Sequence, residues 1–153
     1  MQSVNKISDQ RHNMKLHFEI ITPEKVVYKD EIDQITLPTA DGEITILPGH
    51  IPLIAPTKPG EIALKKDGIS RHIAVMSGFV ETSENKVRLM ADAAELAEEI
   101  DTRRAEEAKK RAEEAKANAK DQFEFSDATA AMERAITRIK IAKRKSRHHS
   151  ETM

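Results

Sequence analysis

The sequence of 153 residues contains no cysteine and no tryptophan, and aromatic residues make up only 3% of it. The absence of cysteine excludes disulfides, thiol nucleophiles and thiolate metal ligands. No apolar run approaches the roughly 18 residues that a membrane-spanning helix needs, so we expect no direct membrane insertion. The 25 basic and 26 acidic residues nearly balance, which gives no indication of a nucleic-acid partner.

Sequence motifs for catalysis are also missing. None of the six histidines lies three or four residues from another with carboxylates at ligand spacing. The sequence has no Gly-rich phosphate loop, no Gly-x-Ser-x-Gly and no His-Glu-x-x-His. His50 follows Pro48-Gly49 in an expected loop, where a packing or surface role fits it better than a chemical one. We therefore predict that the chain is not an enzyme and requires no cofactor or metal ion.

The first half of the chain has the pattern of short strands. Leu16, Phe18 and Ile20 alternate with polar residues, as in a strand with one buried face. Asp67-Gly68 is a strong hairpin signal between two further apolar runs. Short strands at this spacing, with no helix between them, predict an antiparallel β-sandwich or barrel over residues 14–92. We expect the polar residues 1–13 before it to form a disordered leader.

From Ala94 the apolar period changes from 2 to 3.6, and the residues after it favour helix. The pattern predicts a first helix that runs to about Ala119. Ser126 is the expected N-cap of a second helix, after a short connection. Two amphipathic helices joined so closely form an antiparallel hairpin, over residues 93–145, followed by a tail at 146–153.

Arginines accompany the apolar faces of both expected helices. One sector of roughly 140° on the first helix holds Ile100, Asp101, Arg104, Ala105, Ala108, Arg111, Ala112, Ala115 and Ala119. The apolar face of the second consists of Ala128, Met132, Ala135, Ile136 and Ile139, with Arg134 and Arg138 on its shoulder. Clustered arginines cost free energy unless carboxylates or a bound anion neutralise them. Spacing alone leaves two alternatives open: ion pairs with residues such as Asp101 or Glu133, and a bound polyanion.

The end of the second helix is strongly basic. After Ile139 come Lys140, Lys143, Arg144, Lys145 and Arg147, with no acidic residue before Glu151. Cations near a helix C-terminus suit the carbonyl dipole. The functional alternative is docking on an acidic partner surface.

Two stretches resemble a known family. Gly42-Glu43-Ile44-Thr45-Ile46-Leu47-Pro48-Gly49-His50-Ile51-Pro52-Leu53, followed by Gly-Phe-Val-Glu at 78–81, resembles the ε subunit of bacterial-type F-type ATP synthases. Ile100-Asp101-x-x-Arg104-Ala105 is similar to the motif with which some ε subunits bind ATP. The resemblance covers about residues 14–144.

The resemblance implies a non-catalytic subunit of the rotor stalk, peripheral on the cytoplasmic face of the bacterial inner membrane. The sandwich would sit on the γ subunit and the c-ring. The hairpin would either fold against the sandwich or extend along γ and inhibit ATP hydrolysis, with its basic residues facing acidic loops of the catalytic α/β head. ATP would be a regulatory ligand of the folded hairpin, held by Glu95, Ile100, Asp101, Arg104, Ala105, Arg111, Arg134 and Arg138.

Low ATP would then release the hairpin. A ligand that binds only the folded hairpin stabilises it by about 2.7 kcal/mol at a hundredfold excess over its Kd. Two rival hypotheses remain: a free-standing ATP-sensing module, and a structural stalk adaptor without nucleotide binding.

Overall fold

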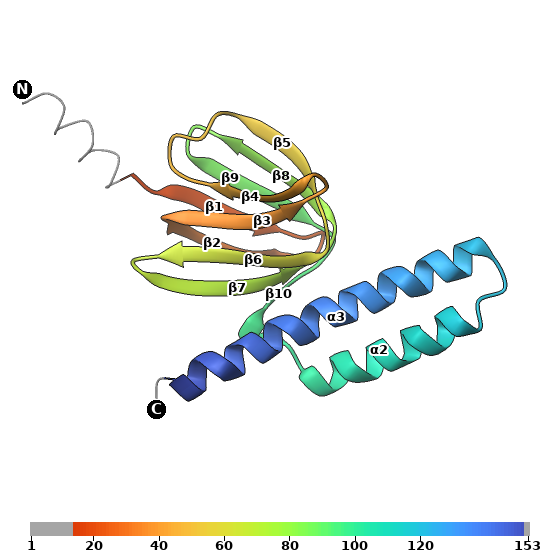
Figure 1. Ribbon diagram of the computed structural model, residues 1–153. Helices are drawn as coiled ribbons and strands as arrows, with labels where there is room; N and C mark the ends of the chain where they lie inside the picture. Colours follow the sequence, from red (N-terminus) through yellow and green to blue (C-terminus); the bar gives the residue numbers. More distant parts are fainter. Residues whose placement is uncertain (1–13, 152–153) are drawn as a thin grey trace, which may run out of the picture.

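The structure is a computed structural model that describes residues 14–151, with side chains as far as Arg144. The predicted leader at 1–13 and the last two residues of the predicted tail lie outside this range. A sandwich of strands stands above a hairpin of two helices, and α3 runs along the sandwich side of that hairpin (Figure 1). The predicted order of a β half followed by a helical hairpin is confirmed.

Ten strands and a short 3-10 helix precede the two long helices. They are β1 (Leu16–Ile21), β2 (Val26–Ile32), β3 (Gln34–Thr39), β4 (Gly42–Ile46), β5 (Leu53–Thr57), β6 (Gly60–Lys66), β7 (Ile69–Val75), β8 (Gly78–Ser83), β9 (Lys86–Ala91), β10 (Ala94–Leu96), η1 (Ala97–Glu99), α2 (Thr102–Ala117) and α3 (Gln122–Glu151). The hydrogen-bonded strand order is β10-β7-β6-β3-β5-β8-β9-β1-β2, with β4 paired to β3. Since β2 also contacts β6, the sheet curls round almost to closure.

One pairing departs from the antiparallel prediction. β1 pairs with β9 in parallel, with Phe18 opposite Val87. The other pairs described are antiparallel. A tight turn forces its two strands to be antiparallel, but most of the domain separates β1 from β9, so no turn sets their direction.

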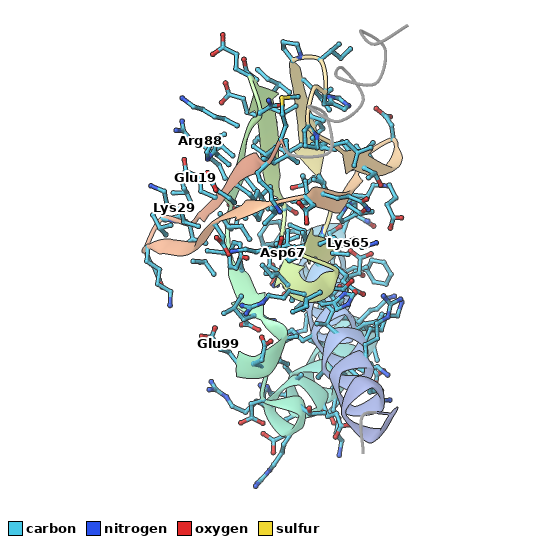
Figure 2. The ribbon with its side chains drawn as sticks, turned by 90° about the vertical axis from the view of Figure 1, so that its left-hand side faces the viewer. Glu19, Lys29, Lys65, Asp67, Arg88 and Glu99 are labelled. Atoms are coloured by element: carbon cyan, nitrogen blue, oxygen red, sulfur yellow. The ribbon has the colours of Figure 1, made fainter. Side chains whose placement is uncertain are left out.

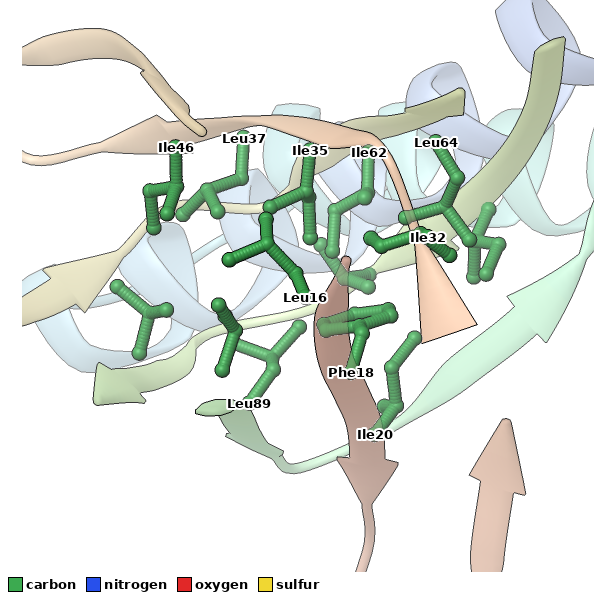
Figure 3. Close-up of a cluster of buried hydrophobic side chains, with 14 of the residues drawn as sticks. Leu16, Phe18, Ile20, Ile32, Ile35, Leu37, Ile46, Ile62, Leu64 and Leu89 are labelled. Carbon is green, nitrogen blue, oxygen red and sulfur yellow. The ribbon is translucent and has the colours of Figure 1, made fainter. Parts of the chain in front are cut away.

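Alternating residues of the strands point inward and form one aliphatic core. Leu16, Phe18 and Ile20 of β1 are fully buried, as their alternation predicts. They pack against inward-facing residues of the other strands, among them Ile32, Ile35, Leu37, Ile46, Ile62, Leu64 and Leu89 (Figure 3). The core of the sandwich therefore lies wholly within the β half.

Two glycines meet specific backbone demands. Asp67 and Gly68 have φ angles of 50° and 78°, which fit the tight β6–β7 hairpin that the Asp-Gly pair predicts. Gly78 begins β8, where an added Cβ would lie 2.0 Å from the carbonyl oxygen of Met90 on β9. β8 and β9 can approach this closely only because residue 78 has no side chain.

The first long helix begins later than predicted, and the second begins earlier. Residues 94–99 form β10 and η1 instead of helix, because Ala94 and Leu96 pack against the sandwich core and β10 pairs with β7. Ser126 is not an N-cap, since α3 already begins at Gln122. Asp121 caps it: the amide of Glu124 donates to Oδ1 of Asp121 at 2.8 Å, and the carboxylate of Glu124 accepts from the amide of Lys120.

α3 is much longer than α2 and packs on two different partners. Its first part lies against α2, where Ala128 and Ala135 are buried. Its later part reaches β6, β7 and η1. There Ile141, only 1% exposed, packs against Ala74, Ala97 and Ile100. The predicted apolar face omitted Ile141 because it assumed α2 as the sole partner.

Candidate functional site

A groove of about 650 Å³ lies between α2 and α3. Small side chains from both helices make its floor, and charged side chains make its rim. It is lined by Ala108, Arg111, Ala112, Ala115, Asn118, Glu124, Asp127, Ala128, Ala131, Arg134 and Arg138. Alanine at facing positions leaves space that longer side chains would fill. The small side chains between α2 and α3 are therefore the reason for the groove.

Three of the four arginines that the helical projection singled out line this groove. Arg138 is half-buried, and its Nε donates to Oε2 of Glu95 on β10 at 2.8 Å. Within the described part of the chain, Arg111 and Arg134 have no carboxylate within ion-pair distance. Two guanidinium groups without partners, beside an apolar floor, suit a ligand with phosphate or carboxylate groups.

The other predicted site residues lie around the start of α2. Asp101 is its N-cap and accepts a hydrogen bond from the amide of Arg104 at 3.2 Å. Arg104 is exposed, while Ala105 is buried and Ile100 packs beside Ile141. Arg104 stands one helical turn before Ala108 of the groove. The structure thus brings Glu95 together with Arg138 and groups Arg111, Arg134 and Arg138, whereas residues 100–105 border the groove without lining it.

A second surface lies on the outer face of the sandwich and escaped the sequence analysis. Cross-strand pairs connect Pro56, Phe79, Met90, Ile21 and Val26 into one row across β5, β8, β9, β1 and β2. Phe79 and Val26 are more than half exposed, at 55% and 54%. We call these five residues the outer apolar row. An apolar row of this length on a solvent-facing sheet is typical of a protein interface.

A charged row runs beside it on the same face. Glu81, Arg88, Glu19 and Lys29 follow one another in register, and Glu19, Lys29 and Arg88 gather on one side of the sandwich (Figure 2). Nε of Arg88 donates to Glu19 at 2.7 Å, and this carboxylate raises the pKa of the guanidinium. These residues border a shallow hollow of about 540 Å³. Opposite charges therefore face one another across neighbouring strands, and Arg88 and Glu19 form an ion pair.

The described residues meet neither the requirements of a membrane-spanning helix nor those of a metal site. No helix between residues 14 and 151 is long and apolar enough to cross a bilayer. Among the side chains that the structure describes, no three His, Asp or Glu residues are grouped so that they could hold a metal ion.

Family comparison covers both halves of the chain. The β-sandwich domain of the ATP synthase delta/epsilon chain matches residues 15–97, and its long α-helix domain matches residues 98–143. The ATP synthase epsilon chain of Nitratidesulfovibrio vulgaris is 40% identical over 126 residues, which are 82% of this chain and 94% of that protein. The epsilon chain of Symbiobacterium thermophilum is 44% identical over 124 residues, or 80% and 89% of the two chains.

Solved structures agree on the fold. A chain in the mitochondrial ATP synthase of Euglena gracilis superposes with a TM-score of 0.71 at 19% identity, over 80% of this chain and 78% of that one. A chain in the central stalk and c-ring of the Tetrahymena thermophila mitochondrial enzyme gives 0.61 at 15% identity, over 84% and 97%. With both domain matches in the same order and curated relatives near 40% identity, this chain belongs to the ATP synthase epsilon chain family.

Proposed function

We propose that this chain is a non-catalytic subunit of the central stalk of an F-type ATP synthase, that it couples the rotor to the catalytic head, and that its hairpin restrains ATP hydrolysis when ATP is scarce. Its family membership supports the stalk position. Its place is then peripheral, on the cytoplasmic face of a bacterial inner membrane. The observation that carries the regulatory part is the groove with Arg111 and Arg134, which form no ion pair with any side chain between residues 14 and 144.

The chemistry of the groove suits a nucleotide. The alanine floor offers an apolar surface for a base, and the three guanidinium groups offer donors for phosphate oxygens. Arg138 is already oriented by Glu95, so less conformational entropy is lost when it meets an anion. Because the lining residues come from both α2 and α3, a ligand can contact all of them only while the hairpin is folded. ATP therefore favours the folded hairpin, in which α2 packs against α3, by mass action.

Calorimetric titration of ATP into the whole chain tests the groove. We expect saturable binding that Arg134→Ala removes, with GTP binding more weakly. Arg103→Ala is the matched control, because Arg103 lies on the outer face of α2, 88% exposed, and pairs with Glu107. Absence of binding at millimolar ATP, or equal losses in the two variants, would leave a structural stalk adaptor as the better assignment.

Hydrolysis assays on the reconstituted synthase test the restraint. The chain should be truncated after Glu99, because β10 pairs with β7 and η1 packs on it, so both belong with the sandwich. We expect the truncated subunit to raise hydrolysis at low ATP and to leave it unchanged at high ATP. Equal hydrolysis with the full and truncated subunits at low ATP would show that the hairpin does not inhibit.

The outer apolar row is the surface that we assign to the γ subunit. Phe79→Glu places a charge within the row and should abolish co-purification with γ. Ile69→Glu is the control, since Ile69 is also exposed but lies at the start of β7, away from the row. A free-standing ATP-sensing module predicts a different result, in which the unaltered chain fails to co-purify with γ at all.

A further inference from the structure

α3 has a second ionic attachment to the sandwich, separate from the groove. Nη1 of Arg144 donates to Oε1 of Glu61 at 2.9 Å and lies 2.8 Å from Oε2. Glu61 belongs to β6, and its side chain is only 17% exposed. Nδ1 of His72, on β7, lies against the same carboxylate and is sealed from solvent. We call Glu61, His72 and Arg144 the carboxylate clasp.

The clasp sits on the face of the sheet that α3 covers. His72 pairs with Ala63 and Glu61 pairs with Ala74, so Glu61 and His72 point to the same side of β6 and β7. Ala74 on that side contacts Ile141, which precedes Arg144 by three residues, or about one helical turn. Docking of α3 therefore brings Arg144 to Glu61, the carboxylate that His72 also meets.

The acidic groups near His72 belong to the sandwich, whereas α3 brings cations. The acidic groups, Glu61 on β6 and Glu95 on β10, belong to the sandwich and stay with it when the hairpin opens. Lys65 shares their side of the sheet by register. Between residues 138 and 144 the charged residues of α3 are all cations, namely Arg138, Lys140, Lys143 and Arg144. Closing the hairpin thus adds positive charge beside His72 and removes none.

We propose that the carboxylate clasp makes closure of the hairpin sensitive to protons, with protonation of His72 favouring release of α3. A protonated His72 shares one carboxylate with Arg144, and two cations on one carboxylate repel each other. Arg144 meets Glu61 only when α3 is docked, so this repulsion shifts the hairpin toward the open state as pH falls.

This inference goes beyond the proposed function, because the clasp needs no nucleotide and none of its three residues lines the groove. Arg144 is also the first residue after the matched helical domain, which ends at residue 143. If the released hairpin is the inhibitory form, the clasp gives this chain a restraint on hydrolysis that responds to acid.

Single-molecule fluorescence on the whole chain without nucleotide tests the proposal. Since the sequence has no cysteine, Lys86→Cys and Lys120→Cys introduce the only two labelling sites, one on the exposed side of β9 and one at the tip of the hairpin. We expect the ratio of open to closed molecules to rise up to about fivefold between pH 8 and pH 6, the size typical of a partly exposed charge pair. That interval spans the range in which histidines ordinarily titrate.

Three variants decide the outcome. His72→Gln should remove the pH response and leave the hairpin closed at both pH values. His17→Gln is the matched control and should keep the full response, because His17 meets Glu31 on β1 and β2, whereas α3 packs on β6 and β7. Arg144→Gln changes an exposed residue of α3 and no residue of the sheet. It removes the ion pair with Glu61, so it should raise the open fraction at pH 8 and halve the response. A response that survives His72→Gln or is undiminished in Arg144→Gln overturns the proposal, as does a constant open fraction in the unaltered chain.

Discussion

Ile141→Ala is expected to detach the hairpin from the sandwich while leaving the sandwich intact. Ile141 is only 1% exposed, and its neighbours are Ala74, Ala97 and Ile100. This cluster is separate from the main core, which contains no residue of α2 or α3. Loss of the side chain should therefore weaken one contact surface and not the whole fold.

The size of the effect follows from the buried carbons. Replacing isoleucine by alanine removes three carbon atoms, worth about 0.8 kcal/mol each, or about 2.4 kcal/mol before any cavity is counted. A cavity left under α3 would raise this toward the middle of the range of about 2–5 kcal/mol seen for such changes. Since about 1.4 kcal/mol corresponds to a factor of ten, the ratio of closed to open hairpins should fall at least about fiftyfold.

Hydrogen exchange resolved along the chain would measure this ratio. We expect faster exchange in the later part of α3 and in α2, with unchanged exchange in β1 and β9. Ile139→Ala is the control, because Ile139 is on the same helix but only half-buried, and its effect should be several-fold smaller. Equal effects of the two substitutions, or loss of protection in the sandwich strands to the same degree, would refute the idea of a separately docked hairpin.

Three further predictions concern the rest of the fold. Gly78→Ala should destabilise the sandwich by about 3 kcal/mol or more, because the new methyl group would meet the carbonyl of Met90; an unchanged Tm contradicts this. The Lys15 ammonium, which donates to Asp33, lowers the pKa of that carboxyl, so the unfolded chain takes up the proton at higher pH. The stabilisation that the Lys15–Asp33 pair gives to the folded chain is complete above about pH 5 and is lost as pH falls below about 4. In Lys15→Met this contribution is absent, so the urea midpoint should drop less between neutral and acid pH. Asp121→Ala removes the cap of α3 and should cost about 1 kcal/mol, seen as faster amide exchange in its first turn, whereas Asp121→Asn should behave as the unaltered chain.

Local patterns were enough to predict the sandwich strands but not all of their pairings. The alternation at Leu16, Phe18 and Ile20 identified the buried face of β1, and Asp67-Gly68 identified a hairpin. The parallel pairing of β1 with β9 was missed, because it depends on contacts far apart in sequence. Residues 94–96 have helix-favouring side chains, yet pairing with β7 outweighs that weak preference.

The groove could be foreseen in part, because a helical projection needs only the sequence. It singled out Arg104, Arg111, Arg134 and Arg138, and the structure groups the last three in the groove. It could not place Ile141, whose partner is a sheet and not the neighbouring helix. The outer apolar row was beyond reach as well, because its members align only when the register of five strands is known.

The length of α3 has a consequence for how its two attachments communicate. With 30 residues it spans about 45 Å, against about 24 Å for the 16 residues of α2. One continuous helix thus carries both one wall of the groove and Arg144 of the clasp. A movement of α3 that breaks the clasp therefore also displaces that wall of the groove. Where two sites favour the same position of one rigid element, each changes the affinity of the other by an equal factor. An anion held in the groove should therefore strengthen the attachment of α3 at the clasp, and loss of the clasp should weaken anion binding in the groove to the same degree.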